Sequence, residues 1–334
     1  SSDLEDVEEF NDGDLKIYNE DSGIAGVSLI RVTIHPKYYL DSYRISTIYY
    51  TLDGVNKELS VDSKINVTFF RTISSVEDFQ QINSNYSENY ALNANLDFSN
   101  IGSSIIRSGI MVNRLEGNGN TISNYTIDTD VGTTYIFKEV RTYMKNVNFT
   151  NITMNYTGQW GTSNLGIVGT AYGEVGNINI TNMTLNGNKK VGRIGFITDS
   201  YVRDYRNINF DTVHISGTDR LGALYAEGDT YNLTGIDIKN TYIDGTSDFV
   251  GGLIGYKHGN SSQRHFYITA DNVHVTTTGG NYSGIVYGHG AAINVNVTNS
   301  SISGNNMVGG ISGQQDTDDV YNNNLTNITV TGKA

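Results

Sequence analysis

The sequence predicts an all-β protein that is mostly a parallel right-handed β-helix, or β-solenoid, of about eight coils. Three observations predict it. An asparagine recurs every 27 to 32 residues, and an apolar residue always follows it three positions later. Within each repeat the apolar residues alternate, which is the period of a β-strand. Glycine is abundant (37 residues) and proline nearly absent (one residue). A fixed period of this length is the signature of a solenoid.

The recurring asparagine marks a bend between two short strands. Ile178 and Ile180 alternate before Asn182, and Met183 and Leu185 alternate after it, but the alternation slips by one residue in between. Asparagine suits such a corner because it tolerates left-handed backbone angles and its side chain bonds nearby groups. We expect the amides to stack into a ladder, which makes their Asn-x-Thr triplets structural rather than glycosylation sites. The corner residues are Asn124, Asn151, Asn182, Thr212, Asn240, Asn272, Asn299 and Asn327.

A third apolar run completes each repeat. Residues 191–197 read Val-Gly-Arg-Ile-Gly-Phe-Ile, and related runs occupy residues 250–255 and 308–313. Glycine within these runs lets neighbouring backbones approach closely. Three strands per repeat of about 29 residues place the parallel β-helix at residues 89–334.

The chain begins with an acidic segment and a small β domain. Residues 1–21 hold nine acidic residues and one lysine, which supplies eight of the thirteen net negative charges, so we interpret residues 1–22 as a solvated linker. Residues 27–34, 43–52 and 64–70 alternate like strands. Asp53-Gly54 predicts a hairpin turn, with residues 55–61 as the returning strand. Residues 23–73 are therefore expected to form a small β-sandwich-like domain.

A capping helix is predicted within residues 74–88. Ser75 is a suitable N-cap, with Asp78 three residues later, and Val76, Phe79 and Ile82 share one face. A solenoid's first coil exposes an unpaired edge and an open core, which need a cap. We expect this helix to supply it.

Several segments in order resemble a known family. They are Ile-Ser-Ser-Val-Glu-Asp-Phe at 73–79, Asn-Tyr-Ala-Leu-Asn-Ala-Asn-Leu-Asp-Phe at 89–98, Leu-Glu-Gly-Asn-Gly-Asn-Thr-Ile at 115–122, Met-Lys-Asn-Val-Asn-Phe at 144–149, and the Val-Gly-Gly-Leu-Ile-Gly type of strand. This order resembles the non-catalytic N-terminal region of streptococcal-type IgA1-protease zinc metallopeptidases. It also resembles the glycine-rich GLUG repeats of Gram-positive surface proteins. The resemblance covers residues 73–334.

The resemblance implies a bacterial cell-surface, extracellular location and a spacer or recognition role. The family's His-Glu-x-x-His motif does not occur in this sequence, so no catalytic residue is carried over. We therefore expect a non-enzymatic adhesin or spacer segment of a larger Gram-positive secreted or cell-wall protein, binding a host glycan or protein. The sequence lacks an initiator Met and stops in mid-repeat, which fits a fragment.

Composition excludes several partners. No basic stripe recommends nucleic acid, and no apolar run of eighteen residues predicts membrane insertion. The chain has no cysteine, so a disulfide framework is excluded. We expect a monomer.

His214, Tyr242 and His274 are the candidate binding residues. They occupy one repeat position in three successive coils, between inward apolar residues, and should face solvent. The competing interpretation is an ordinary surface row, because the other coils hold Thr126, Thr153, Thr184, Ser301 and Thr329 there.

Two alternatives remain. The first is a β-helical polysaccharide lyase or hydrolase using paired carboxylates. The second is a phage tail or appendage shaft, which would be a trimer. No cofactor is expected except calcium, for which Asp316, Asp318 and Asp319 are candidate oxygen ligands. Candidate carboxylates in the variable turns are Asp199, Asp204, Asp229, Asp316, Asp318 and Asp319.

Overall fold

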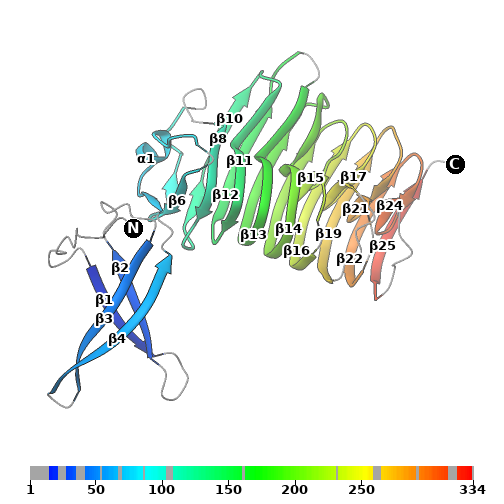
Figure 1. Ribbon diagram of the computed structural model, residues 1–334. Coiled ribbons are helices and arrows are strands. Elements are labelled where there is room, and N and C mark those ends of the chain that lie inside the picture. The colour runs from blue at the N-terminus through cyan, green and yellow to red at the C-terminus, as the bar shows by residue number, and fades with distance from the viewer. Residues whose placement is uncertain are drawn as a thin grey trace. The chain divides into compact units, whose positions relative to one another are not determined.

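The prediction of an all-β protein with a parallel β-solenoid is confirmed, with about seven turns against the eight expected. The chain divides into two compact units, Ser1–Arg71 and Thr72–Ala334, which are described separately (Figure 1). The computed structural model describes residues 15–21, 28–34, 42–52, 55–66, 70–85, 87–102, 108–159, 162–230, 232–258, 265–290, 293–314 and 322–332.

The first unit contains two antiparallel strand pairs. Strand β1 (Leu15–Asp21) pairs with β2 (Ser28–Ile34), and β3 (Ser42–Leu52) pairs with β4 (Val55–Asn66). Leu52 lies opposite Val55, which is the register of the expected hairpin, although Asp53 and Gly54 lie outside the described residues.

Two expectations for this unit differ from the structure. Part of the segment interpreted as a linker is strand β1, and β4 continues to Asn66, so residues 64–66 do not begin a separate strand. The two pairs form separate sheets, and their packing as a sandwich stays a prediction.

The capping helix forms at the predicted position but is short. Helix α1 (Val76–Gln80) follows β5 (Arg71–Ile73). The Ser75 hydroxyl accepts from the Asp78 backbone N–H at 3.1 Å, and the Asp78 carboxylate accepts from the Ser74 N–H at 2.8 Å. Phe79 is fully buried and meets the rings of Phe98 and Phe137 edge to face. The helix therefore covers the core at the first coils, as expected of a cap.

The strands of the solenoid pair in parallel along its length (Figure 1). They are β6 (Asn89–Leu92), β7 (Leu96–Asp97), β8 (Ile110–Glu116), β9 (Thr121–Ser123), β10 (Thr126–Thr129), β11 (Thr133–Lys145), β12 (Asn148–Tyr156), β13 (Thr162–Asn186), β14 (Val191–Ser216), β15 (Tyr225–Gly228), β16 (Asn232–Gly245), β17 (Val250–Gly251), β18 (Ile254–Lys257), β19 (His265–Thr277), β20 (Ser283–Gly284), β21 (Tyr287–His289), β22 (Val295–Gly304), β23 (Val308–Gly309), β24 (Ser312–Gln314) and β25 (Asn324–Gly332).

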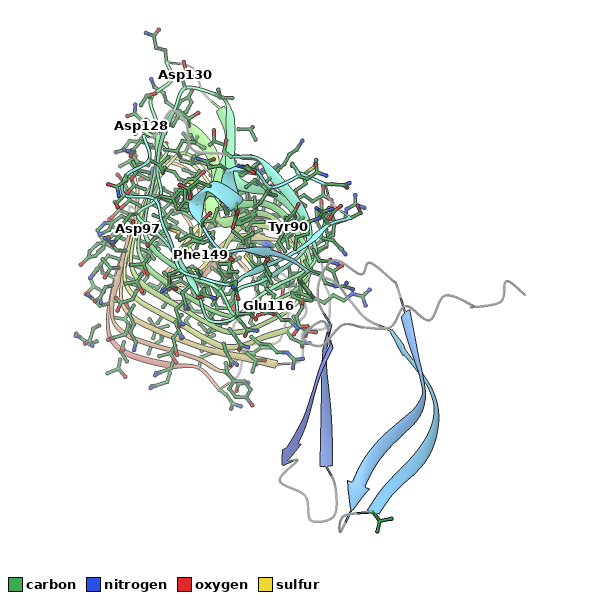
Figure 2. The ribbon with its side chains drawn as sticks, turned by 90° about the vertical axis from the view of Figure 1, so that its left-hand side faces the viewer. Tyr90, Asp97, Glu116, Asp128, Asp130 and Phe149 are labelled. Atoms are coloured by element: carbon green, nitrogen blue, oxygen red, sulfur yellow. The ribbon has the colours of Figure 1, made fainter. Side chains whose placement is uncertain are left out.

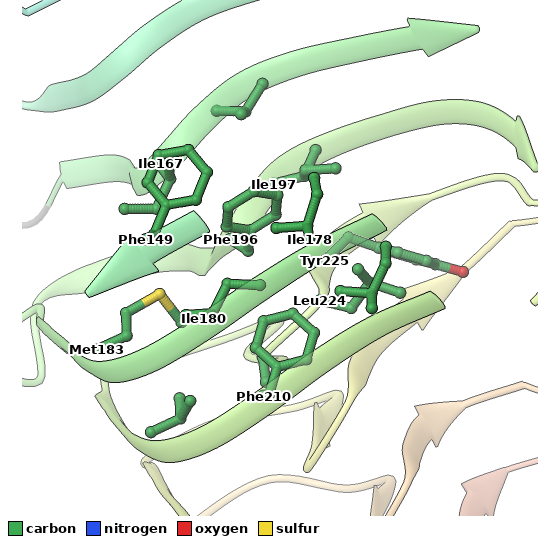
Figure 3. Packing of buried hydrophobic residues seen from close by; sticks show 14 of the residues in the cluster. Phe149, Ile167, Ile178, Ile180, Met183, Phe196, Ile197, Phe210, Leu224 and Tyr225 are labelled. Carbon is green, nitrogen blue, oxygen red and sulfur yellow. The ribbon is translucent and has the colours of Figure 1, made fainter. Parts of the chain in front are cut away.

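Equivalent residues stack coil upon coil and fill one continuous core. Ile178 aligns with Ile208, and Ile208 aligns with Ile236. Phe149, Phe196 and Phe210 are buried, and the ring of Phe196 packs edge to face against both of the others (Figure 3). Viewed from the end where the solenoid begins, Phe149 lies among the inward side chains, whereas Asp97 and Asp128 lie toward the outer edge (Figure 2). The apolar alternation thus identified the inward face correctly.

The predicted corners are left-handed in all eight repeats. The corner residues have φ between 47° and 59°, with Thr212 at the upper end and Asn240 at the lower. The amide ladder also forms: Asn151 donates to Asn124 at 2.9 Å, and Asn182 donates to Asn151 at 2.8 Å. Further rungs join Asn272 to Asn240 and Asn327 to Asn299.

Three corner asparagines donate to an aspartate instead of to another corner residue. Asn124 donates to Asp97, Asn240 to Asp211 and Asn299 to Asp271, at 2.8 to 2.9 Å. Each of these aspartates aligns with the residue that precedes a corner, so its carboxylate reaches the position that a corner amide would fill.

A second ladder was not predicted. Asn146, Asn177 and Asn207 also have left-handed backbones. Asn177 donates to Asn146 at 2.8 Å and Asn207 donates to Asn177 at 3.0 Å, whereas Asn146 itself donates to Glu116 at 2.8 Å. The available signal was an asparagine directly before the first apolar residue of several coils, at Asn146, Asn177, Asn207 and Asn294.

Candidate functional site

The three candidate binding residues lie together on the outside of the solenoid. His214 on β14, Tyr242 on β16 and His274 on β19 are aligned in register. The rings of His214 and Tyr242 stack at 5.0 Å with 8° between their planes, and those of Tyr242 and His274 stack at 5.1 Å with 26°. Tyr242 is 42% exposed. We call these three residues the ring ladder.

The ring ladder lies in an open groove of about 670 Å³. Most of the residues that line it have polar side chains, because the apolar residues of each strand alternate inward to the core. Lys189 forms a 3.2 Å ion pair with Asp244 in this groove, and the Ser216 hydroxyl donates to Asn186 at 2.8 Å. The lining residues are Thr184, Leu185, Asn186, Lys189, His214, Ile215, Ser216, Tyr242, Ile243, Asp244, His274, Thr276 and Thr278.

The amide ladder fixes the tautomer of His274. The Asn272 amide nitrogen donates to Asn240, which leaves its carbonyl oxygen facing His274 Nε2 at 2.8 Å. A carbonyl oxygen only accepts, so Nε2 carries the proton. Nδ1 of the neutral ring then accepts from the Ser301 hydroxyl at 2.7 Å.

The stacking decides what a ligand can meet. The facing rings cover much of each other's faces, so their edges are the groups left for contact along the ladder. The edges of His214 and Tyr242 carry imidazole nitrogens and a phenolic hydroxyl, which exchange hydrogen bonds, whereas both nitrogens of His274 are already bonded to Asn272 and Ser301. The arrangement suits a hydroxyl-rich or otherwise polar ligand better than a purely apolar one.

A second cluster surrounds Glu227. Arg193 Nε lies 2.7 Å from Glu227 Oε2, and His258 Nε2 lies 2.8 Å from Glu227 Oε1. Arg193 also binds Asp199 at 2.8 Å, and Arg220 approaches Glu227 at 3.4 Å. Glu227 is 8% exposed. We call Arg193, Asp199, Arg220, Glu227 and His258 the charged cluster.

The charged cluster contains one of the carboxylates predicted from the sequence. Asp199 aligns with Glu227 on the next coil, and burial raises the pKa of Asp199, although Arg193 opposes the shift. Asp204 instead contacts Asn232 and Arg206. Asp229 lies in a turn, where its backbone N–H donates to Ser200 at 2.8 Å. Of the candidate carboxylates that the structure describes, only Asp199 therefore belongs to the charged cluster.

Four aromatic side chains adjoin the charged cluster. Phe249 stacks on Tyr282 at 5.0 Å and meets Tyr256 edge to face at 4.6 Å. Tyr256 stacks on His289 at 4.7 Å. We call Phe249, Tyr256, Tyr282 and His289 the aromatic corner. Sequence reasoning missed both the aromatic corner and the partners of Asp199, although Phe249 and Tyr282 each directly precede a Gly-containing third strand.

Within the described parts of the chain, no group of three or more His, Cys, Asp or Glu residues is placed to hold a metal ion. Asp316, Asp318 and Asp319 lie outside the described residues, so calcium binding there stays a prediction. Among the described helices, none has the length and apolar character needed to cross a membrane.

Comparison with known proteins gives no relative. No family model matches the chain, and neither a curated protein nor a solved structure matches it.

Proposed function

We propose that this chain is the ligand-binding segment of a larger Gram-positive cell-surface protein, and that it binds a host glycan through the ring ladder. The observation that carries the proposal is the stack of His214, Tyr242 and His274 in an open groove on the outside of the solenoid. A solenoid presents long continuous faces that suit extended ligands.

The chemistry of the groove favours a glycan over an apolar peptide. Ring edges, hydroxyls and amides give both donors and acceptors along three coils. The rings are also held in place before a ligand arrives: His274 is bonded at both nitrogens, and Tyr242 lies between two other rings. Such preorganisation reduces the entropy that binding must overcome.

A polysaccharide-active enzyme is the second candidate, favoured by the alignment of Asp199 with Glu227. A hydrolase needs one carboxyl group to act as acid and another as base or nucleophile. Here Arg193 binds both carboxylates, and Arg220 and His258 also surround Glu227. This saturation supports a structural ion-pair network more than a reacting pair.

The test is a glycan and host-protein array probed with the whole chain, with polysaccharide degradation assayed in parallel. We expect selective glycan binding without product release. Tyr242→Ala should weaken binding at least tenfold, because it removes the central ring. Tyr267→Ala is the matched control, since Tyr267 is another exposed tyrosine (57%) outside the ring ladder, and it should bind like wild type.

Three results would contradict this function. Wild-type protein with no ligand on the array favours the spacer. Selective capture of proteins without glycans points to a protein partner. Released oligosaccharide products favour the enzyme.

A further inference from the structure

Four successive coils place unusual residues at a second left-handed corner. Arg220, Phe249, Tyr282 and Met307 have φ values of 48°, 58°, 63° and 46°. This backbone region is unfavourable for residues with bulky side chains, whereas asparagine and glycine adopt it readily. The first corner of the same coils is filled mainly by asparagine, so the second corner departs from the solution that the chain uses elsewhere.

The backbone requires the corner but not these side chains. The third strands pack so closely that a Cβ added to Gly288 would lie 2.5 Å from the Phe249 carbonyl carbon. One added to Gly255 would lie 2.7 Å from the Arg220 carbonyl carbon. The corner must therefore turn tightly against the glycine of the neighbouring coil. Asparagine would adopt this left-handed backbone with less strain. The backbone conformation therefore does not explain why phenylalanine and tyrosine occupy these positions.

Residues in strained backbone are most often retained where their side chains serve a function. At this corner the side chains build the aromatic corner, in which Phe249, Tyr256 and Tyr282 are half-buried and hold one another in place. The aromatic corner is therefore rigid and partly open to solvent.

Basic and acidic side chains both lie around the aromatic corner. The Arg220 guanidinium carbon lies 5.8 Å from the ring centre of Phe249 and 5.9 Å from that of Tyr256. His258 meets Tyr256 edge to face at 4.8 Å. Arg220 is itself paired with Asp219 at 3.0 Å and with Glu227. An ionic ligand would have to compete with these ion pairs. A neutral ligand that carries both donors and acceptors can bond to the basic and the acidic side chains without breaking them.

We propose that the aromatic corner is a binding site for a neutral hexopyranose unit of a glycan. The sugar would lie along the exposed ring edges, because Tyr282, His289 and Arg220 cover faces of Phe249 and Tyr256. Its hydroxyls would meet Arg220 as a donor and Asp248 as an acceptor. The site follows the ring ladder by six to eight residues in each coil and is a separate set of residues. It shares with the proposed function only the ligand class.

The test uses variants that relieve the backbone strain at the corner and at the same time remove an aromatic ring. Tyr282→Asn introduces the residue that the corner prefers and removes an aromatic ring. We expect its melting temperature to stay level or rise by about 1–3 °C, while its affinity for a neutral oligosaccharide falls at least tenfold. Phe249→Asn is a second variant for the same loss of affinity. Met307→Asn is the control, because Met307 shares the left-handed corner but lies outside the aromatic corner; it should keep wild-type affinity.

Binding is measured by calorimetry with neutral gluco-, manno- and galacto-oligosaccharides, and with hyaluronan as an anionic comparison. Wild-type binding to a neutral oligosaccharide, lost in folded Tyr282→Asn and kept in Met307→Asn, supports the site. The proposal is overturned if wild type binds none of the neutral sugars, if only hyaluronan binds, or if Tyr282→Asn binds normally. Tyr242→Ala separates the two sites. If Tyr242→Ala loses affinity and Tyr282→Asn keeps it, the aromatic corner is not a binding site, and the proposal for the ring ladder is supported.

Discussion

Asn272 and His274 are joined by a hydrogen bond of 2.8 Å from His274 Nε2 to the Asn272 carbonyl oxygen. The bond links the internal regularity of the solenoid to the ring ladder, because the other end of the same amide donates to Asn240. In the next coil Asn299 donates to Asp271 rather than to Asn272. A residue that serves the fold therefore also sets the orientation of a candidate binding residue.

Replacing Asn272 should separate the cost of the backbone from the cost of the amide. Asn272→Ala removes both hydrogen bonds and places a Cβ-bearing residue without a polar side chain at φ 54°, so we expect a loss of about 2 kcal/mol in the free energy of unfolding. Asn272→Gly keeps the left-handed backbone at ease and should lose about 1 kcal/mol. Urea unfolding followed by circular dichroism measures both. Equal stability of the two variants would show that the corner carries no backbone penalty.

Thr212 is the exception among the eight corners, and its replacement should stabilise the protein. Threonine is β-branched and poorly suited to φ 59°, and its hydroxyl donates only to the neighbouring Asp211. In Thr212→Asn the new amide can donate to Asn182, as in the other rungs. We expect a gain of about 1 kcal/mol in the same unfolding measurement. Thr184→Asn, a change outside the corners, should stay within about 0.5 kcal/mol of wild type; a gain equal to that of Thr212→Asn would contradict the explanation.

The sequence predicts the features whose cause is local. A slip in apolar alternation beside an asparagine is enough to predict a corner, and the fixed distance from Asn240 to Tyr242 and from Asn272 to His274 predicts the ring ladder. The aromatic corner could not be predicted in this way. The spacing from the first corner to the second varies from eight residues (Thr212 to Arg220) to ten (Asn272 to Tyr282), so turns of different length hide the alignment.

The charged cluster could not be predicted for a different reason. Arg193 reaches Asp199 on its own coil and Glu227 on the next, and no pattern in the sequence states which arginine rotamer bridges two coils. Only the three-dimensional stacking brings these charges together.

Acid should weaken one rung of the amide ladder. Thr298 and Asn299 both donate to the Asp271 carboxylate, and these hydrogen bonds lower its pKa. A lowered pKa in the folded state contributes stability that is present above the ordinary aspartate value of about 3.9 and is lost as the pH falls through the folded value. Asp271→Asn should therefore melt lower than wild type at pH 7, with a difference that shrinks toward pH 3. Asp130→Asn, at an exposed position, is the control. A difference independent of pH would rule out the carboxylate as its source.

Glu227 should be the most costly carboxylate of the charged cluster to neutralise. Its side chain is 11% exposed and lies among Arg193, Arg220 and His258. Glu227→Gln keeps the size of the side chain but removes the negative charge that the half-buried guanidinium groups of Arg193 and Arg220 face. We therefore expect a loss of about 3 kcal/mol in the free energy of unfolding. Glu174→Gln is the matched control, because Glu174 pairs with Lys145 at a side chain that is 40% exposed, and solvent screening should hold its loss below about 1 kcal/mol. Similar losses in the two variants, measured by urea unfolding, would mean that burial adds nothing to the charged cluster and that it is an ordinary surface network.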